Sequence, residues 1–401
     1  MTVANPLQYL SEQLDGWRKA GTYQRLHVLE SACEPVSMYD GREVINLASN
    51  NYLGLANHPK LKEAAIEAIH KYGAGSGAVR TISGTMSLHM ELERRIAEFK
   101  KVEACVVFQS GFAANAGTVS AILGPEDHIV SDALNHASII DGCRLSRGKI
   151  HVFSHKDTAR AEEILKDLAG KPGHKLLITD GVFSMDGDIG PLPALVEIAE
   201  RYGAIMMIDD AHSSGVLGRN GRGTVDHFGL HGRVDIQVGT LSKAIGVLGG
   251  YVCGRRDLIE FLYHRARPFL FSTSHPPSVA ASCLAAFAIL EQEPERIEQM
   301  WENTRYFKAG LKSAGFDTGL SETPITPVMV GEAKTAHEFS RRLFENGLFA
   351  TGIGFPTVPE GKARIRTIVT ATHTREMLDR ALEILARVGK EMGILQAQDK
   401  A

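Results

Sequence analysis

Short apolar runs alternate with amphipathic stretches through most of the chain. Apolar residues recur at the spacing of a helix face in residues 58–73 and 87–101, which predicts two amphipathic helices. From residue 101 onward the pattern changes to brief, mostly apolar runs typical of buried strands, at 104–108, 128–132, 175–181, 204–212, 234–240 and 249–254. Strands of this kind with helices between them indicate an α/β fold whose mostly parallel sheet is covered on both faces.

The pattern changes again in the C-terminal part of the chain, where residues 293–315 and 374–393 form longer and more charged helical patterns with short strands between them. We therefore predict an N-terminal segment over residues 1–50, a large α/β domain over 51–290 and a smaller C-terminal α/β domain over 291–401. Ligands of such sheets bind at the carboxyl ends of the strands. The residues that follow the apolar runs are therefore the candidates for function.

Composition and charge argue against a nucleic-acid partner and against a zinc site. Hydrophobic residues make up 44% of the 401 residues, enough for a large core, and the formal net charge is −3 without the long basic stripe that a phosphate backbone attracts. The five cysteines are scattered, with no CxxC pair and no Cys/His spacing of a zinc site. We expect no metal site, no nucleic-acid partner and a reducing compartment.

The chain also shows no pattern of a targeting or membrane-spanning segment. Its N-terminus has neither a basic start followed by an apolar stretch nor an Arg/Ser-rich transit pattern. The longest uncharged apolar run, residues 276–290, opens with two prolines and is too short to span a bilayer. We therefore expect a cytoplasmic protein without a membrane partner.

Polar side chains follow three of the predicted strands. Asp209 and His212 lie at the end of one run, Ser184 follows a second and His136 follows a third. A carboxylate at the end of a buried strand is costly unless a cation or a hydrogen-bond donor meets it. Capping of the next helix is an alternative role for Asp209, and a satisfied core or surface position is the alternative for a lone histidine such as His136.

Two further segments suggest a cofactor that carries a phosphate. Residues 110–115, SGFAAN, form a small-residue turn before a helical pattern, as a phosphate site at a helix N-terminus requires, although they match neither the dinucleotide fingerprint nor the Walker loop. Lys243 lies among apolar neighbours, where desolvation favours the nucleophilic amine. With His136 and Asp209, these groups supply what pyridoxal 5'-phosphate (PLP) requires: a phosphate cradle, a ring neighbour, a carboxylate for the pyridinium proton and a lysine.

Blocks of sequence over nearly the whole chain resemble the α-oxoamine synthase family of fold-type I PLP enzymes. They are ASNNYLGLANHP, VRTISGTMSLHMELE, SDALNHASIIDGCRLS, TDGVFSMDGDI, IDDAHSSGVLGRNGRGT, GTLSKA, RPFLFSTSHPP and KARIRTIVTATHT. The resemblance implies a PLP-dependent transferase with a mostly parallel seven-stranded sheet in the large domain and a smaller C-terminal α/β domain. It also implies a homodimer with a shared active site.

The resemblance assigns the residues that would bind the cofactor phosphate. In this sequence they are Gly111, Phe112 and Thr240, together with Ser272 and Thr273, which would reach the phosphate of the neighbouring subunit. The family uses backbone donors at the first two of these positions. The last two positions carry the prediction that the active unit is a homodimer.

The resemblance also assigns a catalytic set around the cofactor ring. His136 would stack on the pyridine, Asp209 would pair with the ring nitrogen, and Ser184 and His212 would lie near the ring hydroxyl. Lys243 would form the internal aldimine and then remove the Cα proton as general base. The resulting quinonoid carbanion would attack an acyl-CoA thioester and expel CoA.

The amino-acid substrate would be held by Asn50 and Arg366, whose guanidinium can grip a carboxylate in a bidentate fork. That grip would fix which Cα bond stands perpendicular to the ring. His136 is a further candidate to donate to the thioester oxygen as negative charge develops there.

Within the family, the blocks look most like those of glycine C-acetyltransferase, also called 2-amino-3-ketobutyrate CoA ligase. This implies that glycine and acetyl-CoA give 2-amino-3-oxobutanoate and CoA, a step of threonine catabolism. The alternatives are 8-amino-7-oxononanoate synthase, which uses alanine and pimeloyl-CoA in biotin biosynthesis, and an enzyme of broad acyl-CoA specificity. Ser242, Gly246 and Val247 depart from the ligase pattern beside Lys243, and Thr81 departs from that of 5-aminolevulinate synthase.

Two other classes are distinguished by simple features. A non-catalytic regulatory member of the family would typically lack the lysine, whereas Lys243 is present here. An aminotransferase would accept a 2-oxo acid, whereas an α-oxoamine synthase would release the free thiol of CoA.

Overall fold

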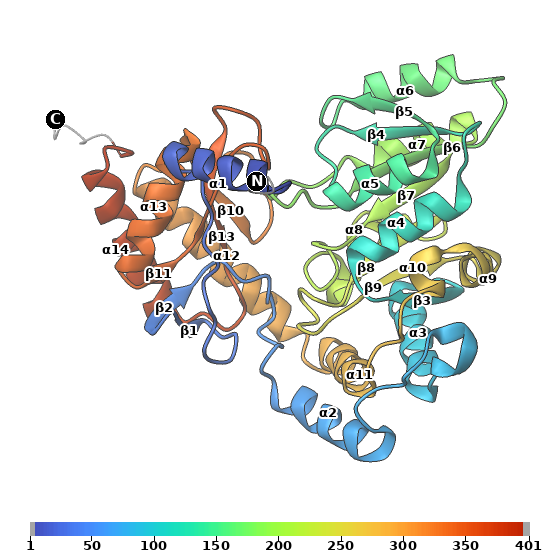
Figure 1. Ribbon diagram of the computed structural model, residues 1–401, viewed down its shortest axis with the longest axis horizontal. Helices are drawn as coiled ribbons and strands as arrows, with labels where there is room; N and C mark the ends of the chain where they lie inside the picture. Colours follow the sequence, from blue (N-terminus) through green and yellow to red (C-terminus); the bar gives the residue numbers. More distant parts are fainter. Residues whose placement is uncertain (1–4, 396–401) are drawn as a thin grey trace. The chain divides into compact units, whose positions relative to one another are not determined.

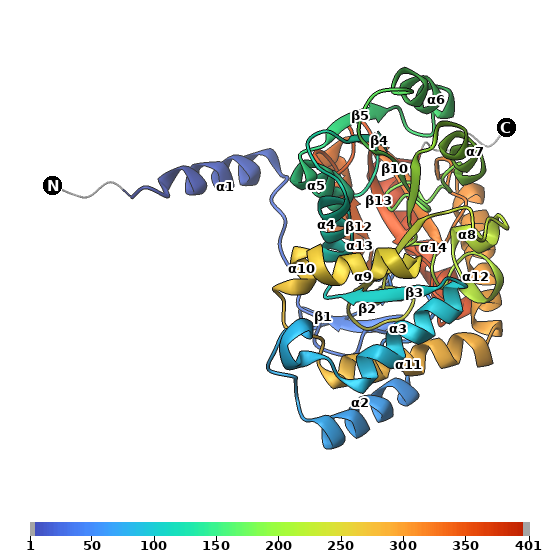
Figure 2. The same ribbon diagram turned by 90° about the vertical axis from the view of Figure 1, so that its right-hand side faces the viewer.

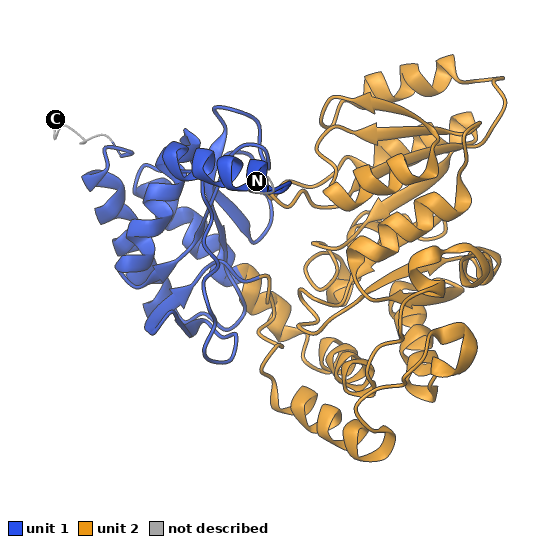
Figure 3. Cartoon of the chain, in the orientation of Figure 1, with its two compact units in different colours: residues 1–49, 302–401 blue, residues 50–301 orange. Residues whose placement is uncertain are grey.

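The computed structural model describes residues 5–395, which fold into two compact units (Figure 1). Residues 50–301 form the larger unit, and residues 1–49 and 302–401 together form the smaller unit (Figure 3). The boundary near residue 301 falls inside the long helix α12, Glu295–Ser313.

A seven-stranded sheet forms the core of the larger unit, with strand order β3-β9-β8-β7-β6-β4-β5. Strands β4 to β8 pair in parallel, and only β9 runs against its neighbours β3 and β8. The predicted mostly parallel seven-stranded sheet is therefore confirmed. The strands are β3 (Ala104–Phe108), β4 (His128–Asp132), β5 (Lys149–Phe153), β6 (Lys175–Asp180), β7 (Ile205–Asp209), β8 (Ile236–Thr240) and β9 (Gly250–Gly254).

Helices cover both faces of this sheet because successive strand residues point to opposite sides. Ile178 of β6 packs in one apolar cluster with residues of α4, α5 and α9, whereas Leu177 packs in another with residues of α6 and α7. The helices α4, α9 and α10 lie together on the first face (Figures 1 and 2). Their bounds are α4 (Gly111–Ile122), α5 (Ala137–Ser146), α6 (Thr158–Asp167), α7 (Leu192–Tyr202), α9 (Arg256–Arg265) and α10 (Arg267–Leu270).

The remaining elements of the larger unit include the two helices that the sequence predicted at 58–73 and 87–101. These are α2 and α3, which pack against α11. A π-helical turn, η1, precedes α3 and was not predicted, because no period-3.6 pattern marks so short a segment. The bounds are α2 (Pro59–Tyr72), η1 (Arg80–Gly84), α3 (Ser87–Lys100), η2 (Arg219–Gly221), α8 (Thr224–His227) and α11 (Pro277–Gln292).

The smaller unit holds two three-stranded sheets, β1-β2-β11 and β10-β13-β12. A buried cluster that includes Phe339, Ile365 and Leu385 joins them to the amphipathic helices α13 and α14. The elements are α1 (Gln8–Ala20), β1 (Val36–Tyr39), β2 (Arg42–Asn46), β10 (Ile325–Gly331), α13 (Ala333–Glu345), β11 (Leu348–Phe349), β12 (Thr351–Ile353), β13 (Ala363–Ile368) and α14 (Arg375–Glu391).

The N-terminal segment, which the sequence analysis set apart as residues 1–50, shares this unit with the C-terminal part of the chain. Ile45 and Asn46 of β2 pair in parallel with Leu348 and Phe349 of β11. The division of the structure therefore differs from the predicted one, because backbone pairing between the two ends of the chain left no local signal in the sequence.

Three properties of the described residues bear on function. No helix within residues 5–395 combines the length and the apolar character needed to cross a membrane. In the same range, no group of three or more His, Cys, Asp or Glu side chains is placed to hold a metal ion. All five cysteines of the chain lie in this range and have free thiols.

Burial on both faces of the sheet predicts that neighbouring residues of β6 are equally sensitive to truncation. Leu177 and Ile178 are both 0% exposed. We expect Leu177→Ala and Ile178→Ala each to lower the free energy of unfolding by roughly 2–5 kcal/mol, because each leaves a cavity in a different apolar cluster. Leu145→Ala, at a side chain that is 63% exposed, is the control and should change it by less than about 0.5 kcal/mol. Urea denaturation followed by circular dichroism measures the difference, and a loss at only one position would contradict two-sided burial.

Candidate active site

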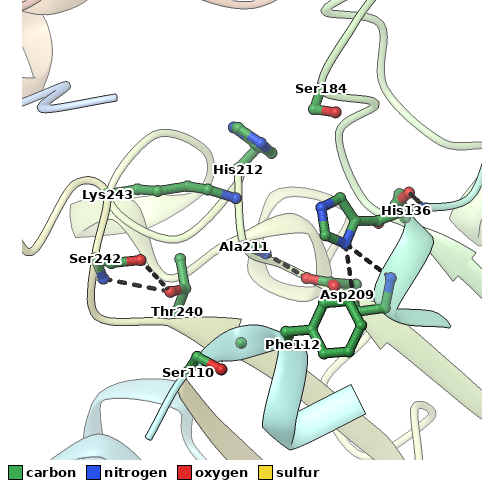
Figure 4. Close-up of a pocket in the computed structure, with 13 residues that line it drawn as sticks. Ser110, Phe112, His136, Ser184, Asp209, Ala211, His212, Thr240, Ser242 and Lys243 are labelled. Atoms are coloured by element: carbon green, nitrogen blue, oxygen red, sulfur yellow. Dashed lines mark hydrogen bonds between the residues drawn. The ribbon is translucent and has the colours of Figure 1, made fainter. Parts of the chain in front are cut away.

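A cavity of about 200 Å³ lies where the parallel strands of the larger unit end (Figure 4). Eight of the predicted site residues line it, namely Gly111, Phe112, His136, Ser184, Asp209, His212, Thr240 and Lys243. The other lining residues are Ser110, Ser138, Asp180, Ala211 and Ser242. Because β4, β6, β7 and β8 run in parallel, their carboxyl ends meet at one edge and bring these separate segments together.

Four predicted site residues do not line this cavity. Asn50 lies at the start of the larger unit, and Arg366 lies on β13 of the smaller unit. Ser272 and Thr273 follow α10, and the carbonyl of Thr273 accepts a hydrogen bond from Gln109 at 2.7 Å. Their roles toward substrate and toward a neighbouring subunit stay predictions.

The floor of the cavity is the N-terminus of α4. Ser110 caps this helix, since its hydroxyl accepts from the amide of Ala113 at 3.0 Å. The amides of Gly111 and Phe112 come before the first intrahelical bonds and have no acceptor within the helix. No acidic residue lies in the first turn, so the positive end of the helix dipole is not offset there. This arrangement suits an anion such as a phosphate group.

Thr240 at the end of β8 borders the same helix terminus. A Cβ on Gly111 would lie 3.4 Å from Cβ of Thr240, so the helix start and the strand end are in close contact. The Thr240 hydroxyl donates to the carbonyl of Gly249 at 2.8 Å and lies 2.7 Å from the Ser242 hydroxyl. Hydroxyls and amides therefore converge on one side of the cavity.

Asp209 is the carboxylate at the centre of the site and is only 4% exposed. Its Oδ2 accepts from the side-chain amide of Asn115 at 2.6 Å, and its Oδ1 accepts from the amide of Ala211 at 2.8 Å. The Asn115 amide group also donates to Ser138 at 3.0 Å. Fixed donors thus orient this carboxylate without cancelling its charge. Asn115 was not among the predicted site residues, although it ends the SGFAAN segment.

Asp180 is a second carboxylate in the cavity that the sequence analysis missed. It ends β6 directly beside Asp209, because the two residues are paired across β6 and β7. Its Oδ2 accepts from the amide of His136 at 2.8 Å. Burial, and then the charge of Asp209, raise the pKa of Asp180 well above its ordinary range. Its position at a strand end, before Gly181, was the available signal.

His136 caps α5 and presents its ring to the cavity. Its Nδ1 accepts from the amide of Ser138 at 3.2 Å and lies 2.7 Å from the Ser138 hydroxyl. The other ring nitrogen points away from Ser138, into the cavity (Figure 4). Burial, together with nearby Lys243, lowers the pKa of His136 although Asp209 acts in the opposite direction. The ring is therefore neutral near pH 7, with its proton on the nitrogen that faces the cavity.

His212 and Lys243 complete the wall opposite His136. The Nδ1 of His212 lies 2.8 Å from the hydroxyl of Tyr52, a fully buried side chain that the sequence analysis did not single out. The Lys243 side chain extends into the cavity toward His212 (Figure 4). The following residues, Ala244 and Ile245, are each 1% exposed. The apolar residues that follow the lysine are therefore buried, and its side chain enters a cavity that is lined largely by polar residues.

Comparison with known proteins places this site in a family. The sequence model of class I and II aminotransferases matches residues 42–385. The chain is similar to 8-amino-7-oxononanoate synthase of Symbiobacterium thermophilum, with 63% identity over 96% of this chain and 99% of that protein. The same enzyme of Thermoanaerobacter pseudethanolicus is 59% identical over 98% and 100%.

A solved structure of serine palmitoyltransferase from S. paucimobilis, with a bound PLP–myriocin aldimine, matches the fold. Its TM-score is 0.93 at 32% identity, and the match covers 98% of this chain and 100% of that chain. The residues that line the cavity fit PLP as well, because they combine an anion site, a buried carboxylate, a neutral imidazole and a lysine. PLP is therefore the cofactor of this site.

These comparisons overturn one prediction. The sequence analysis favoured a glycine C-acetyltransferase of threonine catabolism, but curated relatives that are 53–63% identical over nearly the whole chain are named 8-amino-7-oxononanoate synthase. The prediction was wrong because the blocks on which it rested surround the cofactor. Cofactor-binding residues perform the same task in every member of such a family and do not report the acyl group.

Because β9 approaches α4 closely at Gly250, we expect a side chain at this position to disturb the N-terminus of α4. A Cβ on Gly250 would lie 2.5 Å from the amide nitrogen of Gly111 and against the carbonyl of Ser110, both of which are backbone atoms. We expect Gly250→Ala to push the helix terminus out of place and raise the PLP dissociation constant about tenfold or more. Gly75→Ala is the control, because nothing lies within 4 Å of its added Cβ. Equal PLP affinity of the two variants, measured by fluorescence titration, would show that the helix terminus does not bind the phosphate.

Proposed function

The chain belongs to the class I and II aminotransferase family and, within its fold-type I PLP enzymes, to the α-oxoamine synthases; from that premise we propose that it is an 8-amino-7-oxononanoate synthase. In this reaction alanine and the thioester of pimelate give 8-amino-7-oxononanoate, carbon dioxide and free CoA. The observation that carries the proposal is the identity of 59–63% with synthases of this name over at least 96% of the chain.

PLP supplies an electron sink that stabilises negative charge at Cα of the bound amino acid. Lys243 and the amides of Gly111 and Phe112 would hold this cofactor. Asp209, fixed by two donors, would keep a proton on the pyridine nitrogen. Ser184 and His212 would hydrogen-bond near the ring hydroxyl, as the family resemblance implies.

The same residues would then move protons at defined atoms. Lys243 would remove or return a proton at Cα of the amino acid as general base. The neutral His136 ring would lie against the cofactor, and its cavity-facing N–H would donate to the thioester oxygen as negative charge develops there. Asn50 and Arg366 would bind the alanine carboxylate, as the family resemblance implies, and so orient the amino acid.

We further propose that the enzyme acts as a homodimer, with Ser272 and Thr273 completing the phosphate site of the neighbouring subunit. Phe271, which directly precedes Ser272, is 70% exposed, and a subunit that contacts this segment would cover it. A cytoplasmic location likewise stays a prediction.

The proposal predicts which substrate pair the enzyme prefers. We expect alanine with pimeloyl-CoA to give a kcat/KM at least about 100-fold higher than glycine with acetyl-CoA, because both the acyl chain and the Cα methyl are recognised. Release of CoA, detected with a thiol reagent, measures the activity with each substrate pair. Serine with palmitoyl-CoA is the third pair to be compared. Highest activity with another pair, or similar activity with all of them, would contradict the proposed substrates.

The assignment of Arg366 predicts a selective defect. We expect Arg366→Ala to raise the KM for alanine about tenfold or more while PLP stays bound, because a charge-assisted contact to the substrate carboxylate is lost. Arg387→Ala is the matched control, since Arg387 lies on the exposed face of α14 beside Glu391. Steady-state kinetics at varied alanine concentration measures this KM. An unchanged KM would contradict the assignment of Arg366 to the substrate carboxylate.

A further inference from the structure

His155 lies in the loop between β5 and α6, and its ring bridges two loops that lead to cavity residues. Its Nδ1 lies 3.1 Å from Oδ1 of Asp132, at the end of β4, and its Nε2 lies 3.0 Å from Oδ2 of Asp188, in the loop after β6. The Asp132 and Asp188 side chains are 0% and 3% exposed. A ring that donates from both nitrogens is an imidazolium, because neutral imidazole carries one N–H.

Asp132 fixes the turn that leads to His136. Its Oδ1 accepts from the amide of Leu134 at 2.8 Å as well as from His155, and its Oδ2 accepts from the amide of Lys156 at 2.9 Å. His136 lies two residues beyond Leu134 and begins α5 at the cavity. The position of Asp132 therefore determines the backbone that aims the His136 ring.

Asp188 has the same role in the loop that contains Ser184 as Asp132 has in the turn before His136. Its carbonyl accepts from the amide of Phe183 at 3.1 Å, which closes the loop around Ser184. Its Oδ1 is buried without a hydrogen-bond partner, and its Oδ2 accepts from His155 and, at 3.1 Å, from Nζ of Lys156. The Asp188 carboxylate is thus held by these two cations.

The surrounding charges favour the protonated form of His155. Burial by itself lowers its pKa, but the hydrogen bonds to Asp132 and Asp188 raise the pKa to about 9. The groups that face the ring are these two carboxylates, Lys156 beside it and the edge of the Phe183 ring, with centroids 4.3 Å apart. Two carboxylates meet two cations, so loss of the His155 proton would leave a buried negative charge without compensation.

We propose that His155 is a positioning residue: as an imidazolium hydrogen-bonded to Asp132 and Asp188, it locks together the two loops that present His136 and Ser184 to the cofactor. The inference rests on the PLP-dependent function proposed above. His155 does not line the cavity and acts through the two carboxylates. Since the pKa of His155 in the folded chain is raised from the ordinary 6.5 to about 9, the imidazolium adds its full stability to the fold below about pH 6.5, and its ion pairs with Asp132 and Asp188 are lost as the pH rises through about 9.

The test compares His155→Gln with His264→Gln, a control at an exposed position on α9. Glutamine can donate to one carboxylate but presents its carbonyl oxygen to the other. We expect His155→Gln to raise the PLP dissociation constant and lower kcat, each about tenfold or more, as substitution of supporting residues does at other sites. In the wild type, PLP affinity should weaken as the pH passes about 9, and this step should be missing in His155→Gln. The control should behave as the wild type.

A direct titration makes the test independent of turnover. Histidine-labelled NMR should give His155 a pKa near 9 in the wild type and at least about one unit lower in Asp188→Asn, which removes one charge that stabilises the imidazolium. A wild-type pKa near neutrality would overturn the proposal. So would a lower unfolding temperature of His155→Gln with unchanged PLP affinity, kcat and pH profile, since that outcome describes a purely structural residue.

Failure of the proposed function has a different signature. A wild-type enzyme that releases no CoA from alanine and pimeloyl-CoA at any pH would contradict the synthase assignment. PLP affinity and the His155 titration need no substrate, so they report on the lock whichever acyl group the enzyme uses.

Discussion

The arrangement of the site follows from two carboxylates, Asp180 and Asp209, that end neighbouring strands side by side in one buried cavity. Parallel pairing of β6 and β7 puts them in register, and both are less than 10% exposed. Burial, and then the charge of Asp209, raise the pKa of Asp180 well above its ordinary range. A raised pKa favours the neutral form of Asp180, which would limit its repulsion of Asp209, the carboxylate proposed for the ring nitrogen of the cofactor. Asn115 then only needs to orient that carboxylate.

The third aspartate of this region shows how the chain keeps the charges separate. Asp210 follows Asp209 but pairs with Lys100 at 2.6 Å, and both of those side chains are 0% exposed. The amide of Thr224 also donates to Asp210. Because successive strand residues point to opposite sides, one aspartate faces the cofactor cavity while the next is neutralised inside the fold. Neither Lys100 nor Asp210 lines the cavity, and the two charges compensate each other next to the end of β7.

The sequence predicted those parts of the site that depend on strand ends, and it missed those that depend on pairing between distant segments. Lys243, His136 and Asp209 each follow an apolar run, so their convergence could be expected from a parallel sheet. Asp180 also lies at a strand end, but its importance comes from its register with Asp209, and that of Tyr52 comes from its contact with His212; no local pattern marks either pairing. The pairing of β2 with β11 escaped prediction for the same reason. The predicted acyl substrate, acetyl-CoA, was wrong because the residues that bind the cofactor carry no information about the acyl group.

The function proposed for this cavity requires that Lys243 binds PLP covalently. Borohydride reduction of the PLP-loaded protein makes the bond between cofactor and lysine permanent, so that peptide mass spectrometry can locate it. We expect a single pyridoxyl group on the peptide that contains Lys243. Modification of a different lysine, or no modification in protein that has bound PLP, would contradict it.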